Sequence, residues 1–318
     1  MNLYLQTLGY TANIVAPIFF ILFLGYLLRR CRLIDEAFVA TGSKLVFVIT
    51  LPALVFMSIA RMDFQAVFNP HQLGYVLVGI LLSFGLIWWS AARWIKAPED
   101  LGVFIQGAFR SNYGIIGLAV SFNLFGDAGL AQASLLLALV IPLFNVLSIL
   151  CLSIPMQRSE SMKLSSTLLE ILKNPLILAV LAALPMSWFS VPLPEVVAKT
   201  GTYFANLTLP LALLTIGASL NLKSLHDTSA QAFWATALKL VILPVVLTCG
   251  AWLYGFDGEE LAILMVLFGC PTAAASFVMA RAMGGNAQLA ANIVLTTTLG
   301  SVLTLSAGIY LLRLTGMI

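Results

Sequence analysis

Charged side chains are scarce in this sequence, and their scarcity excludes most functions at once. Only 9% of the 318 residues are Asp, Glu, Lys or Arg, whereas 61% are hydrophobic and the mean hydropathy is +1.02. A soluble domain carries about 25% charged residues to cover its exterior. A soluble enzyme is therefore excluded, and the chain is predicted to lie in a lipid bilayer.

Side-chain patterns for metal, redox and nucleic-acid chemistry are also missing. The four cysteines have no close paired spacing, so neither a disulfide framework nor a zinc site is predicted. The two histidines, His71 and His226, fall in predicted loops without a neighbouring nucleophile. The basic residues are scattered and the net charge is only +3, which does not support nucleic-acid binding. We predict no enzymatic activity, no metal and no cofactor.

Alternating polar and apolar stretches, typical of membrane β-barrels, are absent as well. The chain instead has apolar runs of about twenty residues, the length at which a helix crosses a bilayer core. Residues 1–10 contain no Lys or Arg, so the first run lacks the basic start of a cleavable signal peptide. Ten spans are predicted, near residues 11–28, 41–60, 73–92, 101–124, 129–153, 174–190, 201–220, 232–253, 260–281 and 290–312.

Basic residues set the predicted orientation. Eleven of the sixteen Lys and Arg residues lie in alternate connections that share one face, and Arg61, Lys199 and Arg313 lie on the other. Cytoplasmic loops hold the excess of positive charge. Both termini are therefore predicted outside, in a multi-pass protein of the cytoplasmic (inner) membrane. The remaining two, Arg110 and Lys239, fall inside runs.

The longest polar connection divides the chain into two membrane halves. Residues 1–155 hold the first five runs, residues 156–173 form a predicted cytoplasmic linker, and residues 174–318 hold the last five. The linker is too short for a soluble domain.

The two halves show traces of a repeat. A shift of 158 residues places Pro17 on Pro175, and Thr50-Leu51-Pro52 on Thr208-Leu209-Pro210. A shift of 159 places the segment 126–131 on 285–290, with the shared pattern G-[DN]-A-x-L-A. Because each half has five runs, the second half enters the membrane from the opposite face. Inverted repeats are typical of secondary transporters, which bind substrate at the midplane between broken helices.

Two runs carry the interruptions that such a fold needs. The fourth contains Arg110-Ser111-Asn112-Tyr113-Gly114, and the ninth contains Gly269-Cys270-Pro271-Thr272-Ala273. Proline removes a backbone donor, while Asn, Ser and Gly supply alternative hydrogen bonds and dihedral angles. Both helices are predicted to open at the same depth, with hinges at Ser111 and Gly269.

At these residues the chain resembles the auxin efflux carrier family, within the superfamily that includes the bile acid:sodium symporters. The resemblance covers essentially the whole chain. It is carried by the segments Leu22–Tyr26, Leu45–Pro52, Arg110–Gly114, Leu238–Leu240 with Pro244, and Pro271 with Gly284–Ala290. It implies an all-α membrane carrier of ten helices, built as two inverted five-helix repeats with crossed, broken helices four and nine.

The family resemblance also implies organic anions as substrates: auxin in plants, and malate, malonate or related carboxylates in bacteria. The chain lacks the large central hydrophilic loop of the long plant members and looks like the short bacterial type. Auxin itself is therefore not the expected substrate. An amphipathic organic acid moved with sodium, as in the bile-acid branch, is the alternative, and an anion channel or a receptor would also be compatible with the runs.

Arg110 is the candidate that carries charge, because it lies near the middle of the predicted bilayer core, where a charge is costly. No Asp or Glu lies inside a predicted run, and Glu260 stands at the end of the ninth. Arg110 could bind a substrate carboxylate, or it could bond helix-end carbonyls or line a hydrated intracellular cavity. Asn112 is favoured as a direct substrate contact over a purely backbone-satisfying role, and Tyr113 and Gly114 complete this side of the site.

Across the repeat, the helix that restarts after Pro271 is expected to present free N–H groups near Thr272 and Ala273, an anion site at a helix N-terminus. Pro52 and Pro210 are predicted hinges that free the carbonyls four residues earlier. Lys239 is interpreted as structural, with an ammonium that snorkels to the interface. The coupling ion, proton or sodium, and a homodimer are left open.

Overall fold

The computed structural model describes residues 3–64, 68–156, 174–220 and 229–318. These residues are helical apart from short turns and connections, and the one β-type contact among them is an isolated antiparallel bridge between Ser111 and Thr272. Seven of the described helical stretches are long and apolar enough to cross a membrane. The prediction of an all-α membrane protein is therefore confirmed.

The first half of the chain begins with long helices and then breaks. Helix α1 spans Leu3–Arg30, and a continuous helical stretch follows in α2 (Glu36–Leu45), η1 (Val46–Thr50) and α3 (Leu51–Ala60). The next elements are α5 (Pro70–Trp94), α6 (Pro98–Phe109), η2 (Tyr113–Gly117) and α7 (Leu118–Ser153).

The second half has a similar order of elements. It contains α9 (Pro175–Trp188), α10 (Glu195–Ser219), α11 (Ala230–Ala237), η4 (Leu238–Ile242), α12 (Leu243–Tyr254), α13 (Gly258–Gly269), α14 (Ala275–Ala282) and α15 (Ala287–Leu314). Residues 157–173 of the predicted linker, together with His226, lie outside the described residues.

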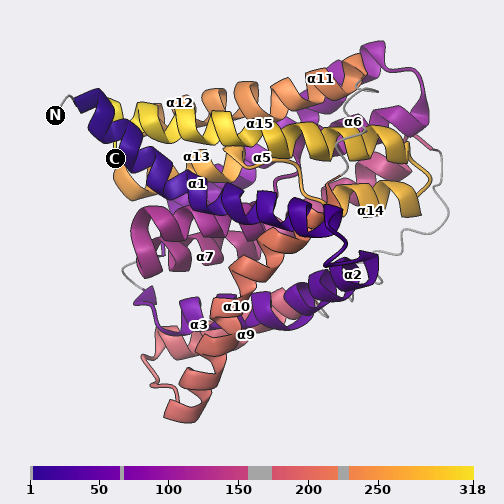
Figure 1. The fold of residues 1–318 in the computed structure, drawn as a ribbon. Coiled ribbons are helices and arrows are strands. Elements are labelled where there is room, and N and C mark those ends of the chain that lie inside the picture. Colours follow the sequence, from indigo (N-terminus) through magenta and orange to yellow (C-terminus); the bar gives the residue numbers. More distant parts are fainter. Residues whose placement is uncertain (1–2, 65–67, 157–173, 221–228) are drawn as a thin grey trace.

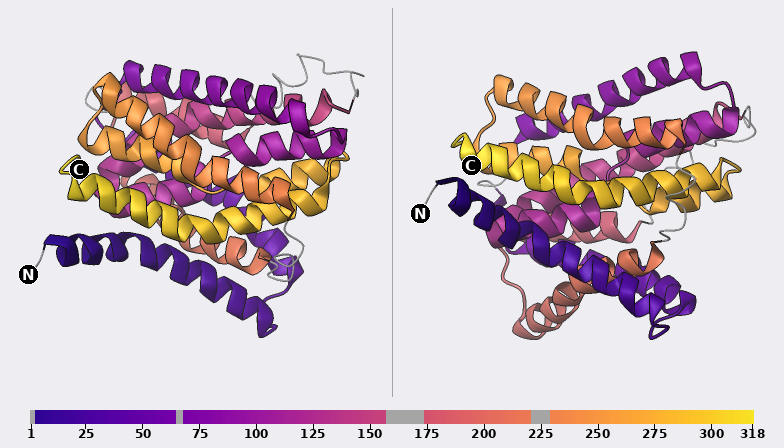
Figure 2. Two further views of the ribbon diagram at one scale, coloured as in Figure 1. Left: turned by 90° about the horizontal axis from the view of Figure 1, so that it is seen from above. Right: turned by 45° about the horizontal axis from the view of Figure 1, so that its top comes forward.

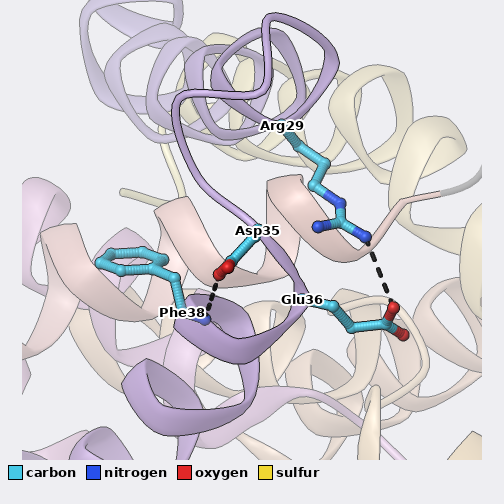
Figure 3. A network of polar contacts seen from close by, with 4 residues as sticks. All are labelled: Arg29, Asp35, Glu36 and Phe38. Atoms are coloured by element: carbon cyan, nitrogen blue, oxygen red, sulfur yellow. Dashed lines mark hydrogen bonds and ion pairs between the residues drawn. The ribbon is translucent and has the colours of Figure 1, made fainter.

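Polar side chains fix the tight connection between α1 and α2 (Figure 3). The Asp35 carboxylate caps α2 by accepting a hydrogen bond of 2.7 Å from the backbone N–H of Phe38. Arg29, at the C-terminal end of α1, lies 3.6 Å from Glu36 in the first turn of α2. Asp35 and Glu36 place negative charge at the N-terminus of α2, and Arg29 places positive charge at the C-terminus of α1, so each charge opposes the partial charge of its helix end. Basic and acidic side chains therefore gather at this turn, away from the apolar stretches.

Two of the helical stretches contain a widened π-turn just before a proline. The N–H of Leu51 bonds to the carbonyl of Val46, and the N–H of Leu243 bonds to that of Leu238, five residues back in each case. Prolines follow at 52 and 244 and lack the N–H that would continue the α-helical ladder. Pro52 thus lies at a real irregularity, whereas Pro210 lies inside the continuous helix α10.

Gly126 divides the longest helical stretch. Its φ of 63° and ψ of −143° are not helical, so the stretch from Tyr113 to Ser153 kinks there instead of running straight. Only glycine adopts such dihedral angles at little cost. The kink allows the segment before Gly126 and the segment after it to run as separate helices.

The helices form two groups (Figures 1 and 2). Helices α2, α3, α9 and α10 pack together, with α1 lying along α10, and the remaining helices pack around α6, α7, α13 and α15. Each group takes helices from both halves of the sequence. Both termini lie at the same end of the bundle (Figure 1), where the guanidinium of Arg313 stacks on the ring of Tyr10.

Glycines let α1 and α10 approach each other closely. Gly217 on α10 faces the backbone of Leu22 on α1, and Gly25 on α1 faces the backbone of Leu214. A Cβ atom on either glycine would overlap the carbonyl oxygen opposite. Small residues at a helix interface are typical of membrane bundles, where packing provides much of the association.

Candidate functional site

The two interrupted segments meet inside the second group of helices. Helix α6 ends at Phe109 and η2 begins at Tyr113, while α13 ends at Gly269 and α14 begins at Ala275. The backbone N–H of Asn112 donates a hydrogen bond of 2.7 Å to the carbonyl oxygen of Pro271. Segments 159 residues apart in the sequence, which were predicted to open at the same depth, therefore lie side by side.

Two hydroxyl groups join the broken ends in a reciprocal way. Ser111 donates to the carbonyl oxygen of Leu267 in the last turn of α13, at 2.8 Å. Thr272 donates to the carbonyl oxygen of Gly107 in the last turn of α6, at 2.6 Å. The last carbonyls of a helix have no partner within the helix, so each break supplies a partner to the other. We call the segments 110–114 and 269–273 the crossing.

The side chains at the crossing are largely buried. Asn112 is 7% exposed, and its side-chain amide makes no hydrogen bond to any residue in the described part of the chain. Tyr113 is fully buried, and its hydroxyl lies close to that of Ser121 without a well-formed hydrogen bond between them. A buried polar group without a partner is costly. Asn112, which keeps a small exposed fraction, is therefore the strongest candidate for a ligand contact at the crossing.

A glycine that sequence reasoning missed makes room for Tyr113. A Cβ on Gly117 would overlap the Tyr113 ring, whereas a Cβ on Gly114 would make ordinary contact with Leu137. The glycine that the local packing requires is therefore Gly117, one helical turn beyond the predicted segment. Its spacing of four residues from an aromatic side chain was the available signal.

The backbone donors after Pro271 both face acceptors within the protein. The N–H of Thr272 donates to the hydroxyl of Thr297 on α15, at 3.1 Å. The N–H of Ala273 faces the carbonyl oxygen of Arg110, as the antiparallel bridge between Ser111 and Thr272 requires, and α14 begins two residues later. Both N–H groups that were expected to be free therefore face an acceptor within the protein.

Arg110 is 8% exposed and is held by neutral side chains. Its guanidinium donates to the amide oxygen of Asn145 and to the hydroxyl of Ser148, both on α7 and both at 2.8 Å, and it also contacts the sulfur of Met279 at 3.1 Å. None of these partners is a helix-end carbonyl or a carboxylate. No acidic group among the described residues therefore contacts this positive charge.

Lys239 does not snorkel, and this expectation was wrong. Its side chain is 1% exposed, and its ammonium donates a hydrogen bond of 2.8 Å to the carbonyl oxygen of Phe268, in the last turn of α13. The π-turn of η4 carries Lys239 toward the bundle interior instead of the interface. A second basic side chain thus lies at the crossing.

A large cavity lies beside the crossing rather than at it. It has a volume of about 800 Å³ and is lined by α1, α3, α7 and α10, so it lies between the two groups of helices. Of the predicted site and hinge residues only Pro210 lines it. Ala119, which follows the Tyr113–Gly117 turn on the chain, is the lining residue closest in sequence to the crossing.

Polar residues of the cavity come from segments that sequence reasoning treated as plain connections or spans. Arg61 donates to the hydroxyl of Thr202 at 2.9 Å and to the carbonyl of Ala198 at 3.2 Å, which joins the end of α3 to α10. Asp127 belongs to the repeated pattern at 126–131, whereas no motif marks the other polar positions. The polar lining consists mainly of Ser58, Arg61, Asp63, Asn123, Asp127, Thr202 and Asn206.

The described residues contain no cluster of three His, Cys, Asp or Glu side chains that could hold a metal ion.

A family model described as "Membrane transport protein" matches residues 11–309, which is nearly the whole chain. The chain belongs to this family, the auxin efflux carriers. It is therefore a membrane transport protein, and its crossing and cavity belong to a transporter.

Curated relatives match over almost their whole length. The "Uncharacterized transporter YfdV" of Escherichia coli K12 is 26% identical over 310 residues, which cover 94% of this chain and 96% of the relative. The "Putative malonate transporter" of Rhizobium meliloti (strain 1021) is 27% identical over 316 residues, 95% of each chain. An "Uncharacterized transporter" of Methanothermobacter thermautotrophicus is 23% identical over 302 residues.

Proposed function

We propose that this family member is a secondary transporter that moves a small mono- or dicarboxylate, of malonate or malate type, across the cytoplasmic membrane by alternating access. The observation that carries the proposal is the crossing, where two broken helices join through Asn112 and Pro271 beside two buried cations. A buried positive field with unpaired polar groups favours an anionic ligand. The relative named for malonate supports the same substrate class.

We further propose that the chain forms ten spans in two inverted five-helix repeats, with one half in residues 1–155 and the other in residues 174–318. The reciprocal bonds from Ser111 to Leu267 and from Thr272 to Gly107 support this arrangement, because an inverted repeat relates each break to the other. The kink at Gly126 supports a division of the longest helical stretch into two spans.

The cavity would be the access path from outside. The chain runs from the N-terminus through α1 and returns through α2 and α3, so Arg61 lies at the end of the bundle that holds both termini (Figure 1). The positive-inside pattern assigns that end to the outside. A volume of about 800 Å³ is ample for a small dicarboxylate.

The proposed binding place is where the cavity approaches the crossing. Asn112 would donate its amide to the carboxylate. Tyr113 and the N–H of Ala273 would join it when the helices shift, because the Tyr113 hydroxyl lies close to Ser121 and the N–H of Ala273 faces the carbonyl of Arg110 in this arrangement. Arg110 would supply positive potential while its guanidinium stays bonded to α7. Movement of one helix group against the other would close the outer cavity and open a path to the opposite face.

Uptake into proteoliposomes tests the proposal. A panel of radiolabelled carboxylates is offered with imposed pH, sodium and voltage gradients in turn, beside a cation and a neutral sugar as controls. Saturable uptake and counterflow of a small carboxylate are expected. Uptake of the cation or the sugar without any carboxylate would overturn the proposal, and conductance without saturation or counterflow would indicate a channel.

A further inference from the structure

Lys239 occupies the end of a broken helix. Its ammonium donates to the carbonyl oxygen of Phe268 at 2.8 Å, and α13 ends one residue later, at Gly269. The neighbouring carbonyl of Leu267 accepts the hydroxyl of Ser111. The last turn of α13 is therefore supplied with two donors from outside the helix, one of which carries a full positive charge.

A helix C-terminus at the centre of a membrane bundle attracts cations. Its unpaired carbonyls and the helix dipole give it a partial negative charge. In carriers with broken helices, such carbonyls coordinate the sodium ion or proton that drives transport. In this chain the Phe268 carbonyl is already bonded to a cation that belongs to the protein.

The surroundings of Lys239 give it no carboxylate partner. The thiol of Cys270 lies nearby, and no Asp or Glu among the described residues pairs with Lys239. The pairs Arg29 with Glu36 and Lys199 with Glu195 lie at exposed helix ends. A buried ammonium is costly without a compensating charge or dipole. The end of α13 is thus the group that compensates it.

The basic residue has no counterpart in the first half of the chain. The shifts of 158 and 159 residues that relate the two halves place Leu81 and Ile80, both aliphatic, opposite Lys239. The reciprocal hydroxyl bonds of the crossing follow the repeat, but the ammonium does not. The buried charge of Lys239 is therefore present in the second half only, which indicates a role that the first half does not share.

We propose that the ammonium of Lys239 is a built-in cation that takes the place of a coupling sodium ion at the end of α13, and that transport by this chain is consequently independent of sodium. The proposal rests on the proposed carboxylate transport for its uptake readout, but not for its binding readout. It disfavours the sodium-coupled mode of the bile-acid branch for this chain.

The first experiment uses wild-type protein in two ways. Carboxylate uptake into proteoliposomes is compared with sodium or choline as the external cation at equal ionic strength, and the melting temperature of the detergent-purified protein is compared in the same two salts. We expect uptake to agree within about twofold and the melting temperatures to be equal. Stimulation of uptake by sodium, or a sodium-specific rise in melting temperature, would overturn the proposal.

The second experiment compares Lys239→Met with Lys239→Arg and with Lys44→Met, a matched change at an exposed lysine on α2. We expect Lys239→Met to lose uptake at least about tenfold in both salts, and the other two to retain it, because only the first removes the buried charge. Wild-type uptake by Lys239→Met would contradict the proposal.

The thermal readout separates the possible failures. If wild-type protein moves no carboxylate, the transport proposal fails, yet the sodium dependence of the melting temperature still tests the cation. If Lys239→Met does not fold, Lys239→Arg and the wild-type salt comparison decide.

Discussion

The backbone N–H of Asn112 donates to the carbonyl oxygen of Pro271, although the two residues lie in different halves of the chain. This bond and the hydroxyl bonds of Ser111 and Thr272 connect the two broken helices to each other. The side-chain amide of Asn112 takes no part in this bond and is left for another partner. The backbone thus holds the crossing together while the side chain can bind a ligand.

Replacement of Asn112 by Ala is expected to weaken carboxylate binding without separating the breaks. A lost hydrogen bond to a charged group costs about 1.5–3 kcal/mol, which corresponds to roughly a ten- to hundredfold rise in dissociation constant. Binding is measured on purified, monodisperse protein, with the melting temperature as the control for folding. An unchanged affinity in both Asn112→Ala and Arg110→Ala would show that the substrate does not bind at the crossing.

The substitution Arg110→Lys is expected to lower the stability of the protein. Its fork reaches Asn145 and Ser148 at the same time, both at 2.8 Å, and a lysine ammonium cannot reproduce that planar geometry. Arg110→Lys should keep the positive charge but lose one of the two bonds, with a fall in stability of about 1 kcal/mol. Arg110→Ala should be worse, because it removes the charge as well.

The comparison of these two variants separates charge from geometry. If transport follows the charge alone, Arg110→Lys retains uptake and Arg110→Ala does not. If both variants lose uptake equally while both remain folded, the anchoring of the guanidinium on α7 is what transport needs. Uptake at the wild-type rate in Arg110→Ala would remove this residue from the mechanism.

Close packing of α1 and α10 should make Gly217→Ala destabilising. The added methyl group would overlap the carbonyl of Leu22, and the helices would have to separate. Overpacking of this kind costs about 1–3 kcal/mol. Gly85→Ala on α5 is the matched control, since nothing lies within 4 Å of its position. Equal melting temperatures for the two variants would contradict the observed crossing of α1 and α10.

Sequence reasoning reached the all-helical membrane class and both breaks, because these depend on composition and on prolines and glycines in apolar runs. It did not place Lys239, because a lysine near a span end snorkels unless a π-turn redirects it, and nothing local marks that turn except Pro244. It also missed the cavity. Asn206 and Asn123 lie in different halves, and only the packing of α1, α3, α7 and α10 brings them together.

The predicted topology is open to a direct test. In a protein without exposed native thiols, a single cysteine at Asn2 is expected to react with a membrane-impermeant maleimide in intact cells. A single cysteine at Ser161, which lies in the predicted linker and outside the described residues, should react only after permeabilisation. Reaction of Ser161→Cys in intact cells, or protection of both termini there, would reverse or refute the orientation.

The outer cavity can be probed at Asn206, which lies on α10 and lines it. With Cys31 and Cys249 replaced, because both are exposed, Asn206→Cys should react with a charged thiol reagent added from outside. The control is Leu207→Cys. This neighbouring side chain is 44% exposed but does not line the cavity, so in a bilayer it would face lipid and react slowly.

At a carboxylate concentration of about ten times the dissociation constant, roughly a tenth of the sites stay free. Labelling of Asn206→Cys should then slow by about tenfold. Labelling from the cytoplasmic side alone, or the same rate with and without carboxylate, would show that this cavity is not the outer path to the substrate site.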